Sequence, residues 1–362
     1  MVNISLDRIT LYEKDYEEES LANNISLDIK AGEFLALIAP GNNGKSRILR
    51  IIAGLVKPDS GTVLFNGLSL SEFSPNYGKL AMVFQSQALY PHLTVRKNLE
   101  FGLKIANMPK ETINARIIEI TDLLDISNLL DLTPKKLSNS QKQLVAIARA
   151  FIKRPQVLIF DEPISELDSH LKVKVQSIIR RFCINLQATV IYATHNPSEA
   201  MTLGDRIVCM DRGKIQQIGT SYELYNKPAN ETVARFIGYP EMNFLEFETN
   251  EESNYKILNL INASYSIPAP KVFMEIIQSH TKAKIGVRAE NLKIVSEKPN
   301  AIPMIVEMQE YMGSQSILYV AREHQTLAVE ILLNERYEIG ETVYIELAES
   351  EIHLFADGKI VI

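Results

Sequence analysis

Cysteine is nearly absent from this sequence of 362 residues, which contains only Cys183 and Cys209. Two cysteines cannot build the disulfide framework of a small secreted domain, and they cannot supply a four-cysteine zinc site. Their scarcity fits a reducing compartment such as the cytosol.

Long hydrophobic runs are also missing. No apolar stretch approaches the roughly 20 residues that a membrane-spanning helix needs. Residues 1–8 have no apolar core behind a basic end, so we do not expect a secretory signal there. Tandem repeats and low-complexity segments are missing too. Taken alone, these absences predict a soluble cytosolic protein.

Positive charge is not in excess. The chain has 38 Lys and Arg residues against 44 Asp and Glu residues, which gives a formal net charge of -6. A mildly acidic chain is a poor general binder of nucleic acid or anionic lipid, so we expect no nucleic-acid partner. The hydrophobic share of 46% and the charged share of 23% are ordinary for globular proteins. The length predicts two or three domains.

Short apolar strands alternate with helical stretches up to about residue 240. The segments 34–38, 157–160 and 190–193 are continuous apolar runs, and the first leads through a Gly/Asn turn into a helix with apolar residues from 48 to 55. Buried strands separated by helices imply a parallel sheet covered on both faces. The stretch of about 91–155 lacks such strands, and we interpret it as a helical insert.

The pattern changes after Gly238, where short β-prone segments dominate and long helices are few. Closely spaced short strands predict a small β-barrel or sandwich. We therefore expect an α/β domain over residues 1–238 and a β-rich domain over residues 239–362. The expected strands of the second domain cover 283–287, 304–307, 316–320, 326–332, 342–347 and 352–355.

Residues 39–46 follow an apolar strand and open a helix, which is the context of a phosphate-binding loop. Amides at a helix N-terminus point at an anion and carry about +0.5 charge. Gly44 lets the backbone approach closely, Lys45 reaches the terminal phosphates, and the Ser46 hydroxyl suits Mg²⁺. The predicted nucleotide-binding residues here are Ala39, Pro40, Gly41, Asn42, Asn43, Gly44, Lys45, Ser46 and Arg47.

Two carboxylates end the apolar strand at 157–160. Asp161 can hold the hydration shell of Mg²⁺, and Glu162 can polarise the water that attacks the γ-phosphate. An acidic turn before Pro163 would explain these residues alone. It would not explain why they follow the phosphate loop in this order, so we predict that the chain binds ATP and Mg²⁺.

At this point the chain resembles an ATP-binding cassette (ABC) protein with a P-loop NTPase fold. Residues 83–95 resemble the Q-loop of the family, and residues 137–150 lie where the signature motif belongs. Residues 165–168 follow the two carboxylates as the D-loop does. His195 ends the next strand, as the switch histidine of the family does.

The resemblance implies a dimer that holds two ATP molecules, each between one copy's phosphate loop and the other copy's signature segment. Glu162 would be the general base or water-orienting group, a role worth about 10²–10⁴-fold in rate. Gln85 would sense Mg²⁺ and the attacking water, and His195 would sense the γ-phosphate. Mg²⁺ would be held by Ser46, Gln85 and, through water, Asp161. The further nucleotide contacts implied are Ser138, Gln141 and Asp168.

An aromatic side chain near the N-terminus is expected to stack on the adenine. Tyr16 matches by its distance from residues 25–27, and Tyr12 is the second candidate. An ordinary loop tyrosine remains the alternative for Tyr16.

The second half of the chain narrows the resemblance to one group of ABC proteins. Residues 236–244 resemble the junction in ATPases of carbohydrate importers, and residues 285–291 and 353–355 resemble their C-terminal TOBE domain, a regulatory unit of the OB-like kind. This resemblance implies an ATPase at the cytoplasmic face of the membrane that is bound to two integral-membrane permeases. A solute-binding protein outside the membrane would deliver the solute to these permeases. The solute would be a carbohydrate or glycerol-3-phosphate. Segment 85–94 and the helices after it would contact the permeases.

Other functions remain open at this stage. Importers of polyamines, iron, sulfate or molybdate also use ATPases with C-terminal β domains. Soluble repair or translation factors share the cassette, but they usually carry two cassettes or a long coiled-coil insertion. A regulatory protein with secondary ATP hydrolysis is the third alternative, which the presence of Glu162 and His195 disfavours.

Several positions depart from the family pattern. Asn139 and Ser140 replace both glycines of the signature, and glycine allows close approach to phosphate and free backbone angles. Asn tolerates a left-handed backbone, so the turn is expected to survive with a crowded phosphate contact. In the phosphate loop, Ala39 and Asn42 replace glycines and Arg47 replaces a threonine.

From these departures we hypothesise a slow but competent ATPase, whose turnover should rise in the double variant Asn139→Gly, Ser140→Gly. The second hypothesis is a heterodimer, in place of a homodimer, in which a different ATPase supplies an intact signature. Purification from native membranes with only one kind of ATPase subunit would exclude it.

Overall fold

The computed structural model describes residues 1–12, 20–41, 44–73, 79–250, 257–260, 266–268, 282–298, 301–347, 351–356 and 358–361. The chain divides into two compact units, Met1–Ser221 and Tyr222–Ile362. Among the described residues, no helix combines the length and the apolar character needed to cross a membrane.

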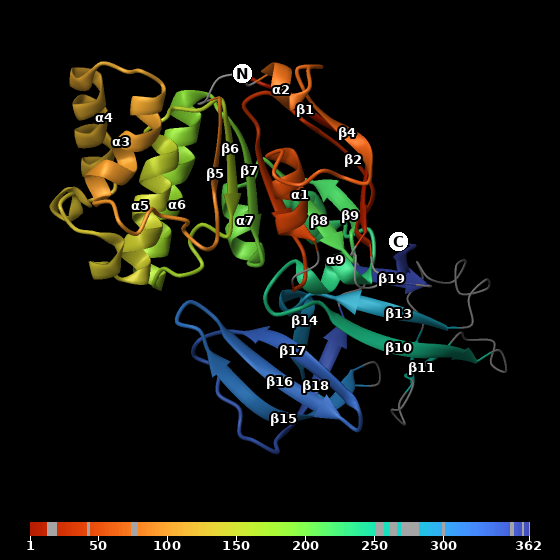
Figure 1. The fold of residues 1–362 in the computed structure, drawn as a ribbon. Coiled ribbons are helices and arrows are strands. Elements are labelled where there is room, and N and C mark those ends of the chain that lie inside the picture. Colours follow the sequence, from red (N-terminus) through yellow and green to blue (C-terminus); the bar gives the residue numbers. More distant parts are fainter. Residues whose placement is uncertain are drawn as a thin grey trace. The chain divides into compact units, whose positions relative to one another are not determined.

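A six-stranded sheet forms the centre of the N-terminal unit (Figure 1). Its strands are parallel except for the antiparallel edge strand β9. In spatial order they are β5 (Leu80–Val83), β6 (Val157–Asp161), β7 (Thr189–Thr194), β3 (Phe34–Ile38), β8 (Arg206–Asp211) and β9 (Lys214–Gly219).

Both faces of this sheet are buried, which explains the continuous apolar runs. In β6, Leu158 and Phe160 pack into the core beneath the helical region. Their neighbours Val157 and Ile159 pack into the core on the opposite face. Because successive strand residues point to opposite faces, a strand covered on both sides needs apolar residues throughout. The predicted parallel sheet is confirmed.

Helices cover the first face, and they include the predicted helical insert (Figure 1). The helices are α3 (Val95–Ile105), α4 (Lys110–Leu123), α5 (Asn139–Phe151) and α6 (Ser169–Leu186), with the 3₁₀ turns η1 (Ser127–Leu129) and η2 (Pro134–Lys136) between α4 and α5. The buried Asn98 side chain of α3 donates hydrogen bonds to backbone carbonyls just before that helix.

A three-stranded antiparallel sheet and α1 (Lys45–Ile52) cover the other face. The sheet has the order β2 (Ser20–Ile29), β1 (Ile4–Tyr12), β4 (Ser60–Phe65), and sequence patterns did not predict it. The predicted helix after the phosphate loop is shorter than expected, because α1 ends at Ile52 and Leu55 is exposed. Two short helices, α2 (Leu70–Phe73) and α7 (Pro197–Leu203), complete the unit.

The C-terminal unit contains two antiparallel sheets around one apolar core. The first has the order β12 (Ser266–Pro268), β11 (Ile257–Leu260), β10 (Asn243–Asn250), β13 (Lys282–Val287), β19 (Ile352–Ala356), β20 (Lys359–Ile360). The second, preceded by η4 (Ala289–Asn291), has the order β14 (Leu292–Val295), β18 (Thr342–Leu347), β15 (Ile302–Tyr311), β16 (Ser316–Arg322), β17 (Gln325–Ile331). The predicted β-rich character of this region is confirmed.

The division between the units falls earlier than the boundary predicted at residue 238. Helices α8 (Ser221–Asn226) and α9 (Glu231–Phe236) precede the β-rich segment. The buried Arg288 guanidinium donates hydrogen bonds to the carbonyls of Tyr225 at 2.9 Å, Ala234 at 3.0 Å and Ile237 at 2.6 Å. This arginine therefore holds both helices to the C-terminal unit.

Candidate ATP-hydrolysis site

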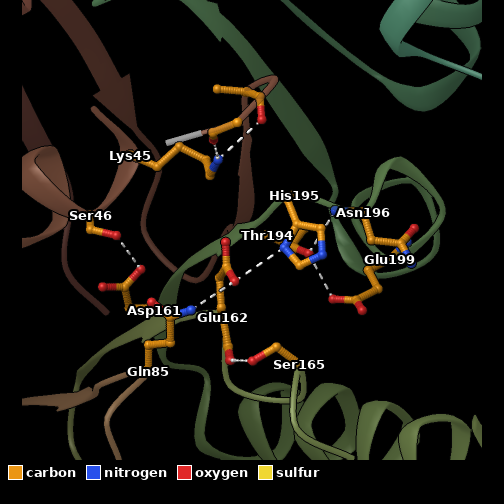
Figure 2. Close-up of polar contacts among 12 residues, drawn as sticks. Lys45, Ser46, Gln85, Asp161, Glu162, Ser165, Thr194, His195, Asn196 and Glu199 are labelled. Carbon is orange, nitrogen blue, oxygen red and sulfur yellow. Dashed lines mark hydrogen bonds and ion pairs between the residues drawn. The ribbon is translucent and has the colours of Figure 1, made fainter. Parts of the chain in front are cut away.

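The candidate site lies at the carboxyl ends of neighbouring parallel strands (Figure 2). The phosphate loop follows β3, Asp161 and Glu162 follow the apolar part of β6, and His195 follows β7. Gln85 comes two residues after β5. Since parallel strands end at one edge of the sheet, four chain segments converge there, as expected for ligand sites of open α/β sheets.

The phosphate loop has the backbone geometry that its glycines predict. Gly41 has φ 61° and Gly44 has φ 85°, angles that favour glycine. Ala39 has no positive φ and is fully buried, so alanine is accommodated where the family pattern has glycine. Asn42 and Asn43 lie outside the described residues, Pro40 is half-buried and Arg47 is exposed.

Lys45 is buried at the start of α1, with its ammonium directed at the loop (Figure 2). Its Nζ donates hydrogen bonds to the carbonyls of Ala39 at 3.1 Å and Gly41 at 2.6 Å. Burial lowers the Lys45 pKa, and the carboxylates of Glu162 and Asp161 oppose this shift. A phosphate beside this ammonium would act in the same direction as the carboxylates, favouring the charged form.

Ser46 and Asp161 form the second polar pair of the site. The Ser46 hydroxyl donates to Oδ1 of Asp161 at 2.8 Å. Burial raises the Asp161 pKa, while the Ser46 hydrogen bond works against that rise. A hydroxyl beside a carboxylate supplies the oxygen donors that Mg²⁺ prefers, so these residues fit the predicted cation.

Glu162 is the centre of the third group. Its Oε2 lies 3.1 Å from Nδ1 of His195 and accepts a hydrogen bond from Nε2 of Gln85 at 3.3 Å. Glu162 has φ 48°, a left-handed conformation that is uncommon outside glycine. Its backbone N–H donates to the Ala193 carbonyl at 3.0 Å, which ties the residue to β7.

Sequence reasoning missed a buried carboxylate, Glu199, which Figure 2 shows below and to the right of His195. Glu199 accepts hydrogen bonds from the hydroxyls of Thr194 at 2.8 Å and Tyr192 at 3.2 Å. The Asn196 side chain caps α7 by accepting from two backbone amides. The signal was present, because Asn196 followed three residues later by Glu199 resembles a capping box, which marks a helix start.

The signature segment forms the start of α5. Ser138 is its N-cap and makes a capping box with Gln141, whose N–H donates to the Ser138 hydroxyl at 3.2 Å. Asn139 and Ser140 are helical residues without positive φ. The expectation that residue 139 needs tolerance of a left-handed backbone is therefore wrong, because this turn is right-handed helix.

The remaining predicted residues lie apart from this cluster. Asp168 caps α6, and its Oδ1 accepts from the Leu171 N–H at 2.9 Å. Among the described side chains, Ser138, Gln141 and Asp168 make no hydrogen bond to Lys45, Ser46, Gln85, Glu162 or His195. Tyr16 lies outside the described residues, and the second candidate, Tyr12, is exposed.

Together these groups offer a cradle for phosphates, oxygen donors for a divalent cation and a carboxylate able to orient water. Residues 22–165 match the sequence model of the ABC transporter family, and residues 285–355 match that of the TOBE domain. The chain is 36% identical over 335 residues to the sn-glycerol-3-phosphate import ATP-binding protein UgpC of Escherichia coli (strain K12), with 92% of each chain covered. The chain belongs to the ABC transporter family.

Other relatives and solved structures agree with this membership. UgpC of Shigella boydii serotype 4 (strain Sb227) is also 36% identical over 92% of both chains. The dimeric, post-hydrolysis structure of the ATP-binding cassette MJ0796 bound to ADP and Pi is 30% identical, with a TM-score of 0.55 over 60% of this chain and 98% of that chain. A second dimeric structure of MJ0796, a bacterial ABC transporter cassette, gives the same values.

Membership confirms the predicted family, the α/β cassette fold with a C-terminal TOBE domain, and the predicted ATPase activity. It also confirms the predicted binding of ATP.

Proposed function

We propose that this chain is the ATP-hydrolysing subunit of an ABC importer for a glycerol-3-phosphate-like or carbohydrate solute, acting at the cytoplasmic face of the membrane. The carrying observation is the 36% identity to UgpC, which spans 92% of both chains and includes the TOBE region. Polyamine, iron and sulfate importers are the alternative solute classes.

In the proposed reaction, the phosphate loop binds the terminal phosphates of ATP. The Lys45 ammonium exchanges its loop carbonyls for phosphate oxygens, and the amides at the start of α1 point at the same charge. Glu162 orients the water for in-line attack, a task that requires the carboxylate to be charged. Gln85 and His195 hold that carboxylate from two sides.

Mg²⁺ would be held by the Ser46 hydroxyl, by Gln85 and, through water, by Asp161. When bound, it neutralises charge that develops on the phosphate oxygens during transfer. Burial and the 2.8 Å hydrogen bond to Ser46 keep the Asp161 side chain in one orientation.

We also propose that two such subunits form a dimer in the transporter. Within the described part of the chain, Ser138 and Gln141 make no hydrogen bond to Lys45, Ser46, Gln85, Glu162 or His195. In a dimer, each signature helix start would face the ATP bound to the other copy, as the resemblance implies. The dimeric MJ0796 structures support this proposal. A second, different ATPase subunit is the alternative partner.

The permease contact is proposed at a cavity of about 240 Å³ next to residues 85–94. Leu55, Phe84, Tyr90 and Phe101 contribute apolar side chains to the lining of this cavity. Arg149, in α5, and Lys153, two residues after the end of α5, also line the cavity, and both are half-buried. Burial lowers the pKa of both groups, and Arg149 lowers that of Lys153 further.

The charges of this cavity suggest what would enter it. Arg149 donates to the Ala88 carbonyl at 2.8 Å, but Lys153 has no hydrogen bond or ion pair among the described residues. Among the described residues that line the cavity, none carries a carboxylate. An apolar permease segment that carries one carboxylate would match both the lining and the unpaired ammonium.

The variant Lys153→Glu tests this contact. We expect co-purification with the permeases to fall about tenfold or more, because a carboxylate would meet a carboxylate in a partly desolvated cavity. Lys110→Glu, at an exposed lysine that begins α4, makes the same charge change outside the cavity and should bind normally. Equal loss in both variants would contradict the proposed contact.

Reconstitution tests the proposed function as a whole. The chain is assembled in proteoliposomes with candidate permeases of its own source organism. ATPase activity is then measured with a matching binding protein that is loaded with sn-glycerol-3-phosphate, maltose or spermidine. We expect stimulation by the first or second solute. Stimulation by spermidine alone would replace the proposed solute, and a chain that never associates with permeases would overturn the transporter function.

A further inference from the structure

Ser140 makes a contact that the family pattern does not allow. Its hydroxyl donates a hydrogen bond to the backbone carbonyl of Glu166, with Oγ 3.1 Å from the oxygen. The signature normally has glycine at this position, and glycine has no side-chain donor. Ser140 is the second residue of α5, so the bond joins the first turn of the signature helix to the loop between β6 and α6.

That loop continues the connection to Glu162. The Ser165 hydroxyl donates to the Glu162 carbonyl at 3.1 Å, and the Leu167 N–H donates to the Ile164 carbonyl at 3.2 Å. The loop ends at Asp168, which caps α6. Two hydroxyl-to-carbonyl bonds therefore connect the signature turn, through the short segment 162–168, to the backbone of the water-orienting residue.

Glu162 is sensitive to movement of this backbone. Its left-handed φ of 48° is held by the hydrogen bond from its N–H to the Ala193 carbonyl on one side and by Ser165 on the other. A shift of the loop would change the direction of the carboxylate relative to Gln85 and His195. A carboxylate can orient a water molecule only when its oxygen lies within hydrogen-bond distance, about 3 Å, of that water.

We propose that Ser140 is a positioning residue that couples the two ATP sites of the dimer. The proposal rests on the proposed function, in which the signature turn of one copy contacts the ATP of the other copy. When the signature turn of one copy closes onto that ATP, the Ser140 hydrogen bond displaces the backbone of Glu166. This displacement changes the orientation of Glu162, which acts on the ATP bound to its own copy. The state of one site is thus transmitted to the water-orienting group of the other.

The coupling should be visible in the kinetics of ATP hydrolysis. Because each site reports its occupancy to the other, the ATPase rate should depend on ATP concentration with a Hill coefficient above 1. Loss of one neutral hydrogen bond should weaken the coupling constant about 2- to 12-fold. A residue that only stabilised the fold would change thermal stability without changing the shape of this curve.

The experiment uses the reconstituted transporter with four variants. Ser140→Ala removes the donor and keeps the Cβ atom, and Ser140→Thr restores a hydroxyl. Ser165→Ala breaks the second bond, and the double alanine variant completes a mutant cycle. We expect a Hill coefficient near 1 for each single alanine variant and a Hill coefficient above 1 for Ser140→Thr. The double alanine variant should have the same Hill coefficient as the single alanine variants.

Several results would overturn the inference. A Hill coefficient of 1 for the unmodified chain would show that the sites are independent. A cooperative unmodified chain whose Ser140→Ala variant keeps the same curve would show that the bond carries no coupling, as would strictly additive effects in the cycle.

A second measurement does not depend on transport. Hydrogen exchange of the full chain with ATP in the Glu162→Gln background should show ATP-dependent protection of residues 163–168, which Ser140→Ala removes and Ser140→Thr restores. Unchanged protection in Ser140→Ala would overturn the inference. Failure of the unmodified chain to associate with any permease would overturn the proposed function instead.

Discussion

At the scale of single residues, Glu162 combines three constraints in one position. Its carboxylate is held between His195 at 3.1 Å and Gln85 at 3.3 Å, while its backbone takes a left-handed angle. Its side chain is only 13% exposed, whereas that of His195 is 59% exposed. In the proposed reaction, the exposed histidine would therefore change partners when a γ-phosphate binds, while the largely buried carboxylate would stay in place beside the attacking water.

The variant Glu162→Gln tests the assigned role. The amide keeps the size of the side chain but cannot act as a general base, so we expect turnover to fall about 10²–10⁴-fold with ATP binding retained. Turnover is measured as phosphate release, and binding by equilibrium titration with a fluorescent ATP analogue. A variant that hydrolyses ATP at the original rate would remove Glu162 from the mechanism.

Asn139 and Ser140, which replace the two glycines of the signature, both lie in right-handed helix. The freedom of φ that glycine offers is therefore not needed at these positions. The predicted gain of turnover in the double glycine variant therefore depends only on less crowding at phosphate. If Ser140 couples the sites, the same variant also loses cooperativity, and the two effects separate in the single variants.

At the scale of elements, one buried amide shapes the segment proposed to meet the permeases. Asn98 in α3 is fully buried. Its Oδ1 accepts from the Tyr90 N–H at 2.8 Å, and its Nδ2 donates to the carbonyls of Tyr90 at 3.1 Å, Leu93 at 3.2 Å and Thr94 at 3.0 Å. This side chain holds residues 90–94 in one conformation against the start of the helix.

We expect Asn98→Ala to leave buried backbone groups unpaired and to lower the free energy of unfolding by about 1–3 kcal/mol. Stimulation of the ATPase by the assembled permeases should fall as well, because residues 90–94 lose their fixed conformation. Urea unfolding and the stimulated ATPase rate measure the two effects.

Thr94→Ala is the matched comparison for this prediction. It removes one helix-cap hydrogen bond, that from the Lys97 N–H, and should cost about 1 kcal/mol. Equal losses in the two variants would contradict the special role of Asn98.

Elements buried on both sides were the ones that sequence patterns predicted best. Strand β3 was expected at 34–38 and spans Phe34–Ile38, because every one of its residues is buried. Strands β1, β2 and β4 were missed. In β1 apolar residues alternate with polar ones, and its pairing with β2 shifts register three times, so no continuous run marks it.

The candidate site likewise contains some residues that the sequence predicts and others that it does not. Residues proposed to act on ATP, such as Lys45 and Glu162, stand in short motifs at the ends of apolar runs, so the sequence alone predicts them. The Glu199 carboxylate instead accepts hydrogen bonds from the hydroxyls of Thr194 and Tyr192 inside the fold. That relation exists only after folding brings β7 and α7 together. The backbone angles at 139 and 140 likewise depend on the fold.

At the scale of the whole molecule, the C-terminal unit contains a histidine in a setting that disfavours its charge. Burial lowers the pKa of His353, the guanidinium of Arg288 lowers it further, and Glu351 opposes the shift. Above the usual histidine pKa of about 6.5, the side chain is neutral in both the folded and the unfolded chain. As the pH falls below that value, the unfolded chain takes up the proton first, so folding loses stability.

We therefore expect the C-terminal unit to be less stable at pH 5.5 than at pH 7.5, and His353→Gln to reduce this difference. The stability is measured on the full chain by urea-dependent hydrogen exchange in β13 and β19. His324→Gln, at an exposed histidine between β16 and β17, controls for the loss of a histidine. Stability that rises as the pH falls would contradict the prediction.

The Arg288 contacts also decide where the chain can be cut. A fragment that ends at residue 238 would keep α8 and α9 but lose the guanidinium that binds the carbonyls of Tyr225, Ala234 and Ile237. Three backbone acceptors would lose their buried donor, and Ala234 of α9 would lose its packing against Met242, Phe244 and Phe355. A cassette prepared in isolation should therefore stop near Ser221, and swapping TOBE domains between relatives should move both helices along with the β-sheets.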